Sequence, residues 1–164
     1  MNPIKKYQYL TKILAIVILL FFTKAVKAQD FKLHSKFIIK NARINNSNIT
    51  EEWINGDSFM GLYTVDTGDD IYFAVINPGK KSSSTGRVTN LRDQRLENSP
   101  SGDEKQLFTF QWSYANSYDD KKGVASVKII QTRSQYGVSF DCTIVPENKD
   151  IISFSGMMNS QGKE

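Results

Sequence analysis

The strongest constraint on the fold is a two-residue alternation of apolar and polar side chains in the second half of the chain. In residues 105–116, KQLFTFQWSYAN, the aromatic residues fall on one face and small polar residues fall on the other. The aromatic face consists of Phe108, Phe110, Trp112 and Tyr114. Successive side chains of a β-strand point to opposite faces, so this pattern predicts a half-buried antiparallel strand.

Similar runs follow one another along most of the chain. Residues 136–145 repeat the alternation, and residues 70–76, DIYFAVI, are apolar on both faces, which predicts a strand that is covered on both sides. The other predicted strands are residues 36–44, 59–66, 124–132 and 151–158, with residues 86–91 as a polar and weaker candidate. Short turn-like clusters separate most of these runs.

About eight short strands at regular spacing predict an all-β fold, a small antiparallel meander that forms either a barrel or a sandwich. In strand number alone this outline resembles lipocalin-like barrels. Only residues 48–54 look helical, where Asn48 followed by Glu51 resembles a capping box for a single turn. Two polar segments, residues 77–86 and 92–104, are predicted as long loops, where binding residues often lie on a β scaffold.

The N-terminus has the features of a secretory signal peptide. Three lysines precede an apolar run from Ile13 to Phe22, and Val26-Lys27-Ala28 supplies a cleavage site before Gln29. Ten apolar residues rise only about 15 Å as a helix, roughly half of a bilayer's hydrocarbon core. We therefore predict a signal peptide over residues 1–28, a single β-rich domain over residues 29–164, and export to the periplasm or the extracellular space without a membrane span.

Removal of residues 1–28 changes the charge balance. The whole chain has 21 Lys and Arg against 17 Asp and Glu, but five of the lysines and no acidic residue lie in residues 1–28. The remainder therefore has 16 basic and 17 acidic residues and a net charge of about −1. Without a cationic excess to release counterions, general binding to nucleic acid is not expected.

The segment YTVDTGDD, residues 63–70, contains a short match to a catalytic motif. Val65-Asp66-Thr67-Gly68 resembles the Asp-Thr-Gly motif of retroviral-type aspartic proteases, in which two such aspartates share a proton. Here Asp69 and Asp70 follow the glycine and would add repulsion beside such a pair, and the flanks are two predicted strands. We predict that Asp66 is a structural residue at a hairpin corner.

Other catalytic and metal-binding arrangements have little support in the sequence. His34 is the only histidine and Cys142 the only cysteine, so a disulfide within the chain and a His/Cys zinc site are both excluded by count. Cys142 lies on the apolar face of residues 136–145 and is predicted to be a buried core residue. We predict no cofactor and no metal, and no catalytic residue is identified, although carboxylates that converge in space would escape this reasoning.

The aromatic face of residues 105–116 is the most specific candidate site. It would form a wall of the core, or it would line a cavity in which Phe108, Phe110, Trp112 and Tyr114 bind a small apolar or carbohydrate ligand. The sequence thus favours a non-enzymatic, exported domain that binds a ligand or an envelope component. Two alternatives remain, a carboxylate-based hydrolase of extracellular polymers and a protein-interaction or inhibitor module that acts through the 77–104 loops.

Overall fold

The computed structural model describes residues 31–54, 57–65, 68–96, 102–148 and 150–158. The predicted signal peptide and its cleavage site lie outside these residues. The strands are β1 (Phe31–Ile44), β2 (Ser47–Asn48), β3 (Phe59–Val65), β4 (Ile71–Asn77), β5 (Ser82–Leu96), β6 (Glu104–Asn116), β7 (Lys122–Ser134), β8 (Gly137–Pro146) and β9 (Ile152–Met158). The helical elements are α2 (Thr50–Trp53) and the 3-10 turn η1 (Pro78–Lys80).

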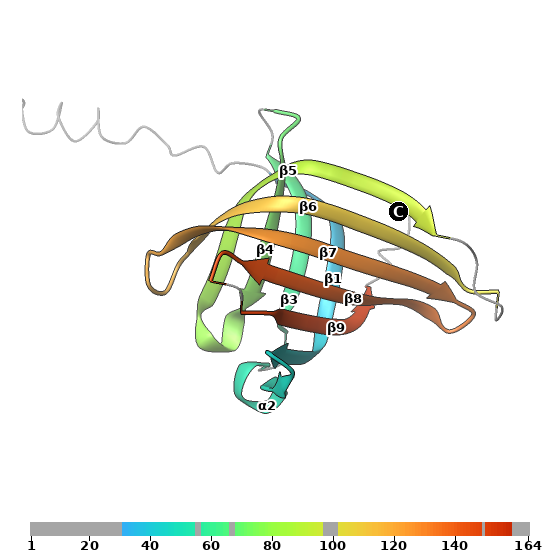
Figure 1. The fold of residues 1–164 in the computed structure, drawn as a ribbon, viewed down its shortest axis with the longest axis horizontal. Helices are drawn as coiled ribbons and strands as arrows, with labels where there is room; N and C mark the ends of the chain where they lie inside the picture. Colours follow the sequence, from blue (N-terminus) through green and yellow to red (C-terminus); the bar gives the residue numbers. More distant parts are fainter. Residues whose placement is uncertain (1–30, 55–56, 66–67, 97–101, 149, 159–164) are drawn as a thin grey trace, which may run out of the picture. The chain divides into compact units, whose positions relative to one another are not determined.

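The strands form a closed antiparallel meander barrel (Figure 1). From β3 onward each strand pairs with the next, and β1 pairs with both β3 and β9, which closes an eight-stranded barrel with β2 as an extra short strand. The all-β meander predicted from the alternation is confirmed, and of the two architectures left open it is the barrel. Closure leaves fewer unpaired strand edges than an open sheet would have.

Side chains fill the interior of the barrel. The face that was predicted to point inward on β6, β7 and β8 does so, and its mid-strand residues are almost fully buried. Phe73 lies at the centre, with its ring edge-to-face against Phe110 at 5.3 Å and against Trp112 at 5.1 Å between ring centroids. Such aromatic pairs add to the burial of apolar surface that stabilises the barrel.

One end of the barrel is covered by the segment between β2 and β3. The ring of Trp53, in α2, packs against Phe154 at 4.8 Å between centroids, and the side-chain amide of the buried Asn77 donates to the carbonyl oxygen of Trp53. The predicted single turn is therefore present. The predicted capping box is not, because Ile49 is the N-cap, although the side chain of Asn48 accepts a hydrogen bond from the Thr50 N–H at 2.9 Å.

The two predicted long loops are largely wrong, because residues 82–96 form β5, the longest strand. The sequence of β5 is unusually polar for a strand, for two reasons. In the closed part of the barrel, the backbone of β6 approaches Gly86 so closely that a Cβ at this position would lie only 1.8 Å from the carbonyl oxygen of Ser113. Beyond Arg87 the strand no longer pairs with β4, so its outer edge faces solvent and carries charged residues.

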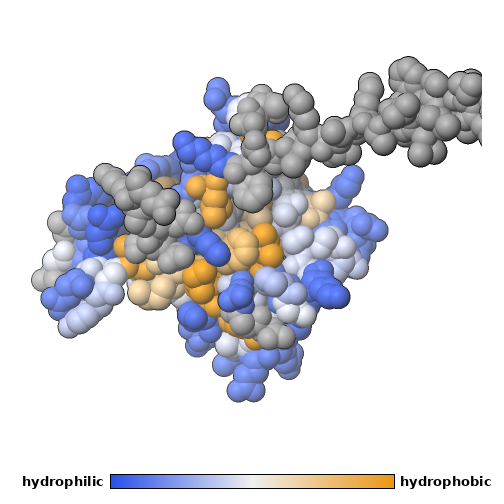
Figure 2. Space-filling model, turned by 180° about the vertical axis from the view of Figure 1, so that it is seen from behind, coloured by the Kyte–Doolittle hydropathy of each residue, from blue (hydrophilic) through white to orange (hydrophobic). Residues whose placement is uncertain are grey.

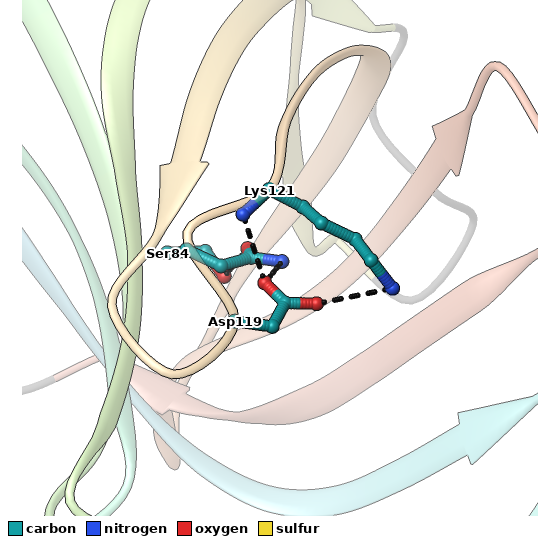
Figure 3. Close-up of polar contacts among 4 residues, drawn as sticks. Ser84, Asp119 and Lys121 are labelled. Carbon is teal, nitrogen blue, oxygen red and sulfur yellow. Dashed lines mark hydrogen bonds and ion pairs between the residues drawn. The ribbon is translucent and has the colours of Figure 1, made fainter.

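The hairpin between β6 and β7 is fastened to the start of β5 by polar side chains (Figure 3). The Ser84 hydroxyl donates to Asn116 Oδ1 at 2.7 Å, and the Asn116 amide donates to Asp119 Oδ1 at 3.0 Å. The Lys121 N–H also donates to Asp119, and its ammonium lies 3.4 Å from the second carboxylate oxygen. Asp119 is thus a structural residue of a turn.

Strands β5 to β8 extend together beyond the rest of the barrel (Figure 1). β4 pairs with β5 only up to Arg87, and β9 begins to pair with β8 at Ser139. We call the projecting part of β5 to β8 the overhang; it consists of residues 92–96, 104–108, 129–134 and 137–138. Its inner face continues the inner face of the barrel.

Figure 2 shows the barrel from behind, on the side opposite to the one that carries β6 to β9. Apolar residues gather in the middle of this view, and β1, β3 and β4 lie behind β6 to β9 in Figure 1. On these strands Tyr63 and Tyr72 stack at 5.6 Å between centroids, and the outward-facing Ala74 is buried. β4 is therefore covered on both faces over much of its length, as its sequence predicted. Burial and, to a lesser extent, Tyr72 raise the pKa of Tyr63.

Candidate functional site: the inner wall of the overhang

The inner face of the overhang changes from apolar to polar along the strands. In the row nearest the barrel, Phe108 lies opposite Ile129, which lies opposite the buried Cys142. The next row outward contains Arg95, Gln106 and Gln131 on neighbouring strands, and the last row contains Glu104, Arg133 and Val138. We call the last two rows the polar wall.

Hydrogen bonds hold three side chains of the polar wall in place, those of Arg95, Glu104 and Gln106. The Gln106 amide donates to both carboxylate oxygens of Asp93, at 2.8 and 2.9 Å. The Arg95 guanidinium donates to Glu104 Oε1 at 3.1 Å. Because donors and acceptors are paired across neighbouring strands, their positions are set by the register of the sheet as well as by side-chain rotamers.

A pocket of about 260 Å³ lies over the polar wall. Small-molecule pockets typically measure roughly 300–1,000 Å³, so this pocket lies just below that range. The residues that line it are Arg95, Glu104, Lys105, Gln106, Gln131, Arg133 and Val138. Arg133 is exposed, and it forms no ion pair with another described residue.

The predicted aromatic site is divided between the core and the ends of the barrel. Phe110 and Trp112 are each 3% exposed, and the Trp112 indole N–H donates to the carbonyl oxygen of Phe73 at 3.0 Å. Phe108 and Tyr114 are half-buried, with Phe108 adjoining the polar wall and Tyr114 lying toward the other end of β6. Of the four predicted ligand-binding residues, Phe108 is thus the one placed beside the pocket, and a role of any of them in binding stays a prediction.

Two of the residues considered for catalysis, Cys142 and His34, lie in different surroundings in the described part of the chain. Cys142 lies in the core at 1% exposure, and burial raises the pKa of its thiol well above the usual range. His34 is exposed at an irregularity in β1, with Nε2 3.1 Å from the Thr64 hydroxyl. Among the described residues no group of three or more His, Cys, Asp or Glu side chains is placed to hold a metal ion.

Asp66, the residue of the protease-like motif, lies outside the described residues, so its role at a hairpin corner stays a prediction. The strands on either side of it, β3 and β4, are antiparallel neighbours, as the hairpin hypothesis requires. In the same connection Asp70 pairs with Arg87 of β5 at 2.6 Å, at the last residue where β4 and β5 are joined.

Sequence reasoning missed the polar wall because it assigned residues 92–104 to a loop. A signal was present, since the inward positions of residues 104–116 continue from Phe108 back to Gln106 and Glu104 at the same period. The inward residues of β5 could not be found in this way, because an irregularity between Thr89 and Arg92 shifts their register against β6.

No helix in the described part of the chain is long and apolar enough to span a membrane. Comparison with protein-family models, with curated proteins and with solved structures found no match to this chain.

Proposed function

We propose that this protein is an exported, non-enzymatic domain that binds a compact, neutral, hydroxyl-rich ligand, such as a short carbohydrate, on the polar wall. The observation that carries the proposal is the pocket over Arg95, Glu104, Gln106, Gln131 and Arg133, whose side chains offer both hydrogen-bond donors and acceptors. Export is inferred from the N-terminal pattern of charge, apolar run and cleavage site.

The charges around the pocket are nearly balanced, which favours a neutral ligand. Arg95 and Glu104 neutralise each other, and Asp93, which orients Gln106, offsets the charge of Arg133, so that Lys105 of the pocket lining leaves a single positive charge. A sugar hydroxyl both donates and accepts, so it can bond to an amide, a guanidinium and a carboxylate in one place. An anionic ligand would be better served by an excess of cations.

The packing of the barrel favours an external site over an internal one. Ligand-binding barrels enclose an unfilled space, whereas here Phe73, Phe110 and Trp112 pack against one another in the interior. Phe108 adds an apolar surface beside the polar groups, which suits the apolar face of a sugar ring.

The test is calorimetric titration of the purified protein with neutral sugars, including cellobiose, maltose and chitobiose. We expect at least one of them to bind, and we expect Gln106→Ala and Gln131→Ala to weaken its binding by about tenfold each, because a lost hydrogen bond in a preorganised site costs on the order of 1 kcal/mol or more.

The matched control is Gln94→Ala, which removes the same side chain from an exposed position of β5 that lines none of the pockets named in this article and is expected to leave this affinity unchanged. Two results would contradict the proposal: equal losses of affinity in Gln106→Ala and Gln94→Ala, or binding of an apolar dye alone with an affinity that the wall variants do not change.

A further inference from the structure

The outer face of β5 to β9 and β1 carries a row of cations and hydroxyls at right angles to the strands. The cross-strand partners run from Arg92 to Thr109, Lys128, Thr143, Ser153 and Arg43, one residue on each of six neighbouring strands. We call these six residues the outer row. With a strand separation of ~4.8 Å, the outer row runs about 24 Å along the curved surface of the barrel.

Every member of the outer row faces away from the core. Lys128 lies between the buried Val127 and Ile129, and Thr143 lies between the buried Cys142 and Ile144. The three cations are exposed and the three hydroxyl residues are half-buried. None of the three cations forms an ion pair with another residue in the described part of the chain, so their charges are available to a ligand.

Two depressions lie over the outer row and meet at Thr143. One, of about 740 Å³, spans β5 to β8 and includes Arg92, Gln111 and Lys128 in its lining. The other, of about 410 Å³, spans β8, β9 and β1 and includes Arg43 and Asp141. Because Thr143 lines both, the two depressions lie side by side on this face of the sheet, and together we call them the trough.

Amide and hydroxyl groups fill the space between the cations. Gln111 donates to the Ser126 hydroxyl at 3.0 Å, and Asn41 donates to the Ser155 hydroxyl at 3.2 Å. The outward-facing side chains of the trough include three cations and one acid, Asp141, so the trough as a whole is cationic.

We propose that this trough binds a linear anionic polysaccharide that lies across the strands. Charge complementarity selects a polyanion, and the length of the row selects an extended polymer over a single anion. The hydroxyl and amide groups between the cations match the neutral hydroxyls of a sugar chain. Nucleic acid fits less well, because the outward-facing lining offers no aromatic ring on which bases could stack.

The proposal is independent of the proposed function, since the trough and the polar wall lie on opposite faces of β5 to β8 and have separate variants. The probe is polygalacturonate, a linear polymer of carboxylated sugars, and its methyl ester supplies the same backbone without charge. We expect the protein to bind the acid form with an affinity that falls with rising salt, and to bind the ester at least about tenfold more weakly.

The decisive variant combines Arg43→Gln, Arg92→Gln and Lys128→Gln. We expect it to lose at least about tenfold in affinity for polygalacturonate and to show a shallower salt dependence. The control combines Lys80→Gln, Lys81→Gln and Lys122→Gln, which removes the same charge from exposed positions outside the trough and is expected to change affinity by less than about twofold. Near-ultraviolet circular dichroism of both variants checks the fold.

Three outcomes would overturn the proposal. The first is equal affinity of the two triple variants for polygalacturonate, which would reduce the effect to net charge. The second is equal binding of the acid and the ester. The third is preferential binding of duplex DNA or of phosphatidylglycerol vesicles over polygalacturonate, with the same dependence on Arg43, Arg92 and Lys128, which would assign the trough to another class of partner.

Discussion

The inner face of β6 has two halves that share one strand and one periodicity but differ in environment. In the closed barrel this face holds Phe110 and Trp112, each 3% exposed. In the overhang it holds Gln106 and Glu104, and the Glu104 side chain is 51% exposed. The same alternation that predicts a strand therefore points a side chain into a packed core in one half and onto an open wall in the other.

The difference depends on whether another strand lies across the barrel interior from this part of β6. Phe110 faces Phe73 of β4 across the interior, whereas the overhang projects beyond the last pair of β4 and β5. A buried polar side chain without a partner destabilises a protein, but the same side chain on an open wall keeps its contact with water. Polar groups therefore gather where closure ends.

The largest expected effect is on the packed half. Phe110→Ala should lower the free energy of unfolding by about 3–5 kcal/mol, because it leaves a cavity beside Phe73 and Trp112. Gln106→Ala, on the same face of the same strand, should cost less than about 1 kcal/mol. Urea denaturation of both variants measures this contrast, and equal losses would show that the wall is packed like the core.

A smaller effect is expected from removal of the indole N–H of Trp112. Trp112→Phe keeps an aromatic ring but loses the buried hydrogen bond to Phe73, at a cost of about 1–3 kcal/mol. After Trp53→Phe removes the second tryptophan, Trp112 should emit at short wavelength and resist quenching by acrylamide. Strong quenching would place Trp112 at an opening, as the cavity hypothesis requires.

The exposed ion pair of the wall should matter still less for stability. Arg95 and Glu104 have side chains that are 70% and 51% exposed, so Arg95→Ala should change the free energy of unfolding by at most about 1 kcal/mol. The same change should weaken ligand binding more than it weakens the fold. A loss of stability comparable to that of Phe110→Ala would mean that the overhang folds as part of the core.

The smallest effect concerns pH and the β6–β7 hairpin. Desolvation works to raise the pKa of Asp119, but hydrogen bonds from Asn116 and Lys121 and the Lys121 charge outweigh it and lower the pKa. The stability from a lowered carboxylate pKa is complete above the unfolded-state value, about 4, and is lost as the pH falls through the folded-state value. The difference in melting temperature between the wild type and Asp119→Asn should therefore shrink between pH 6 and pH 3. A constant difference over this range would exclude an ionic contribution.

The sequence alone determined the strands and the direction of their side chains in most of the chain. The alternation in residues 105–116 and 136–145 is local, because a strand turns each side chain by half a revolution, so Phe110 and Cys142 could be assigned to the inward face without knowledge of their neighbours. The meander also follows from local signals, since short turns join antiparallel neighbours.

Only the tertiary structure decided that β1 closes the sheet against β9 and that residues 82–96 form a strand. Both depend on pairing between residues that are far apart in the chain. The sequence of β5 is polar because Gly86 lies close to the backbone of β6 and because one edge of the strand faces solvent, and neither feature produces a two-residue alternation of apolar and polar side chains. The polar wall and the outer row likewise combine residues from several strands, so they form only when the strands pair. A shift of one residue in register would separate Lys128 from Thr109 and Thr143 and turn it to the other face.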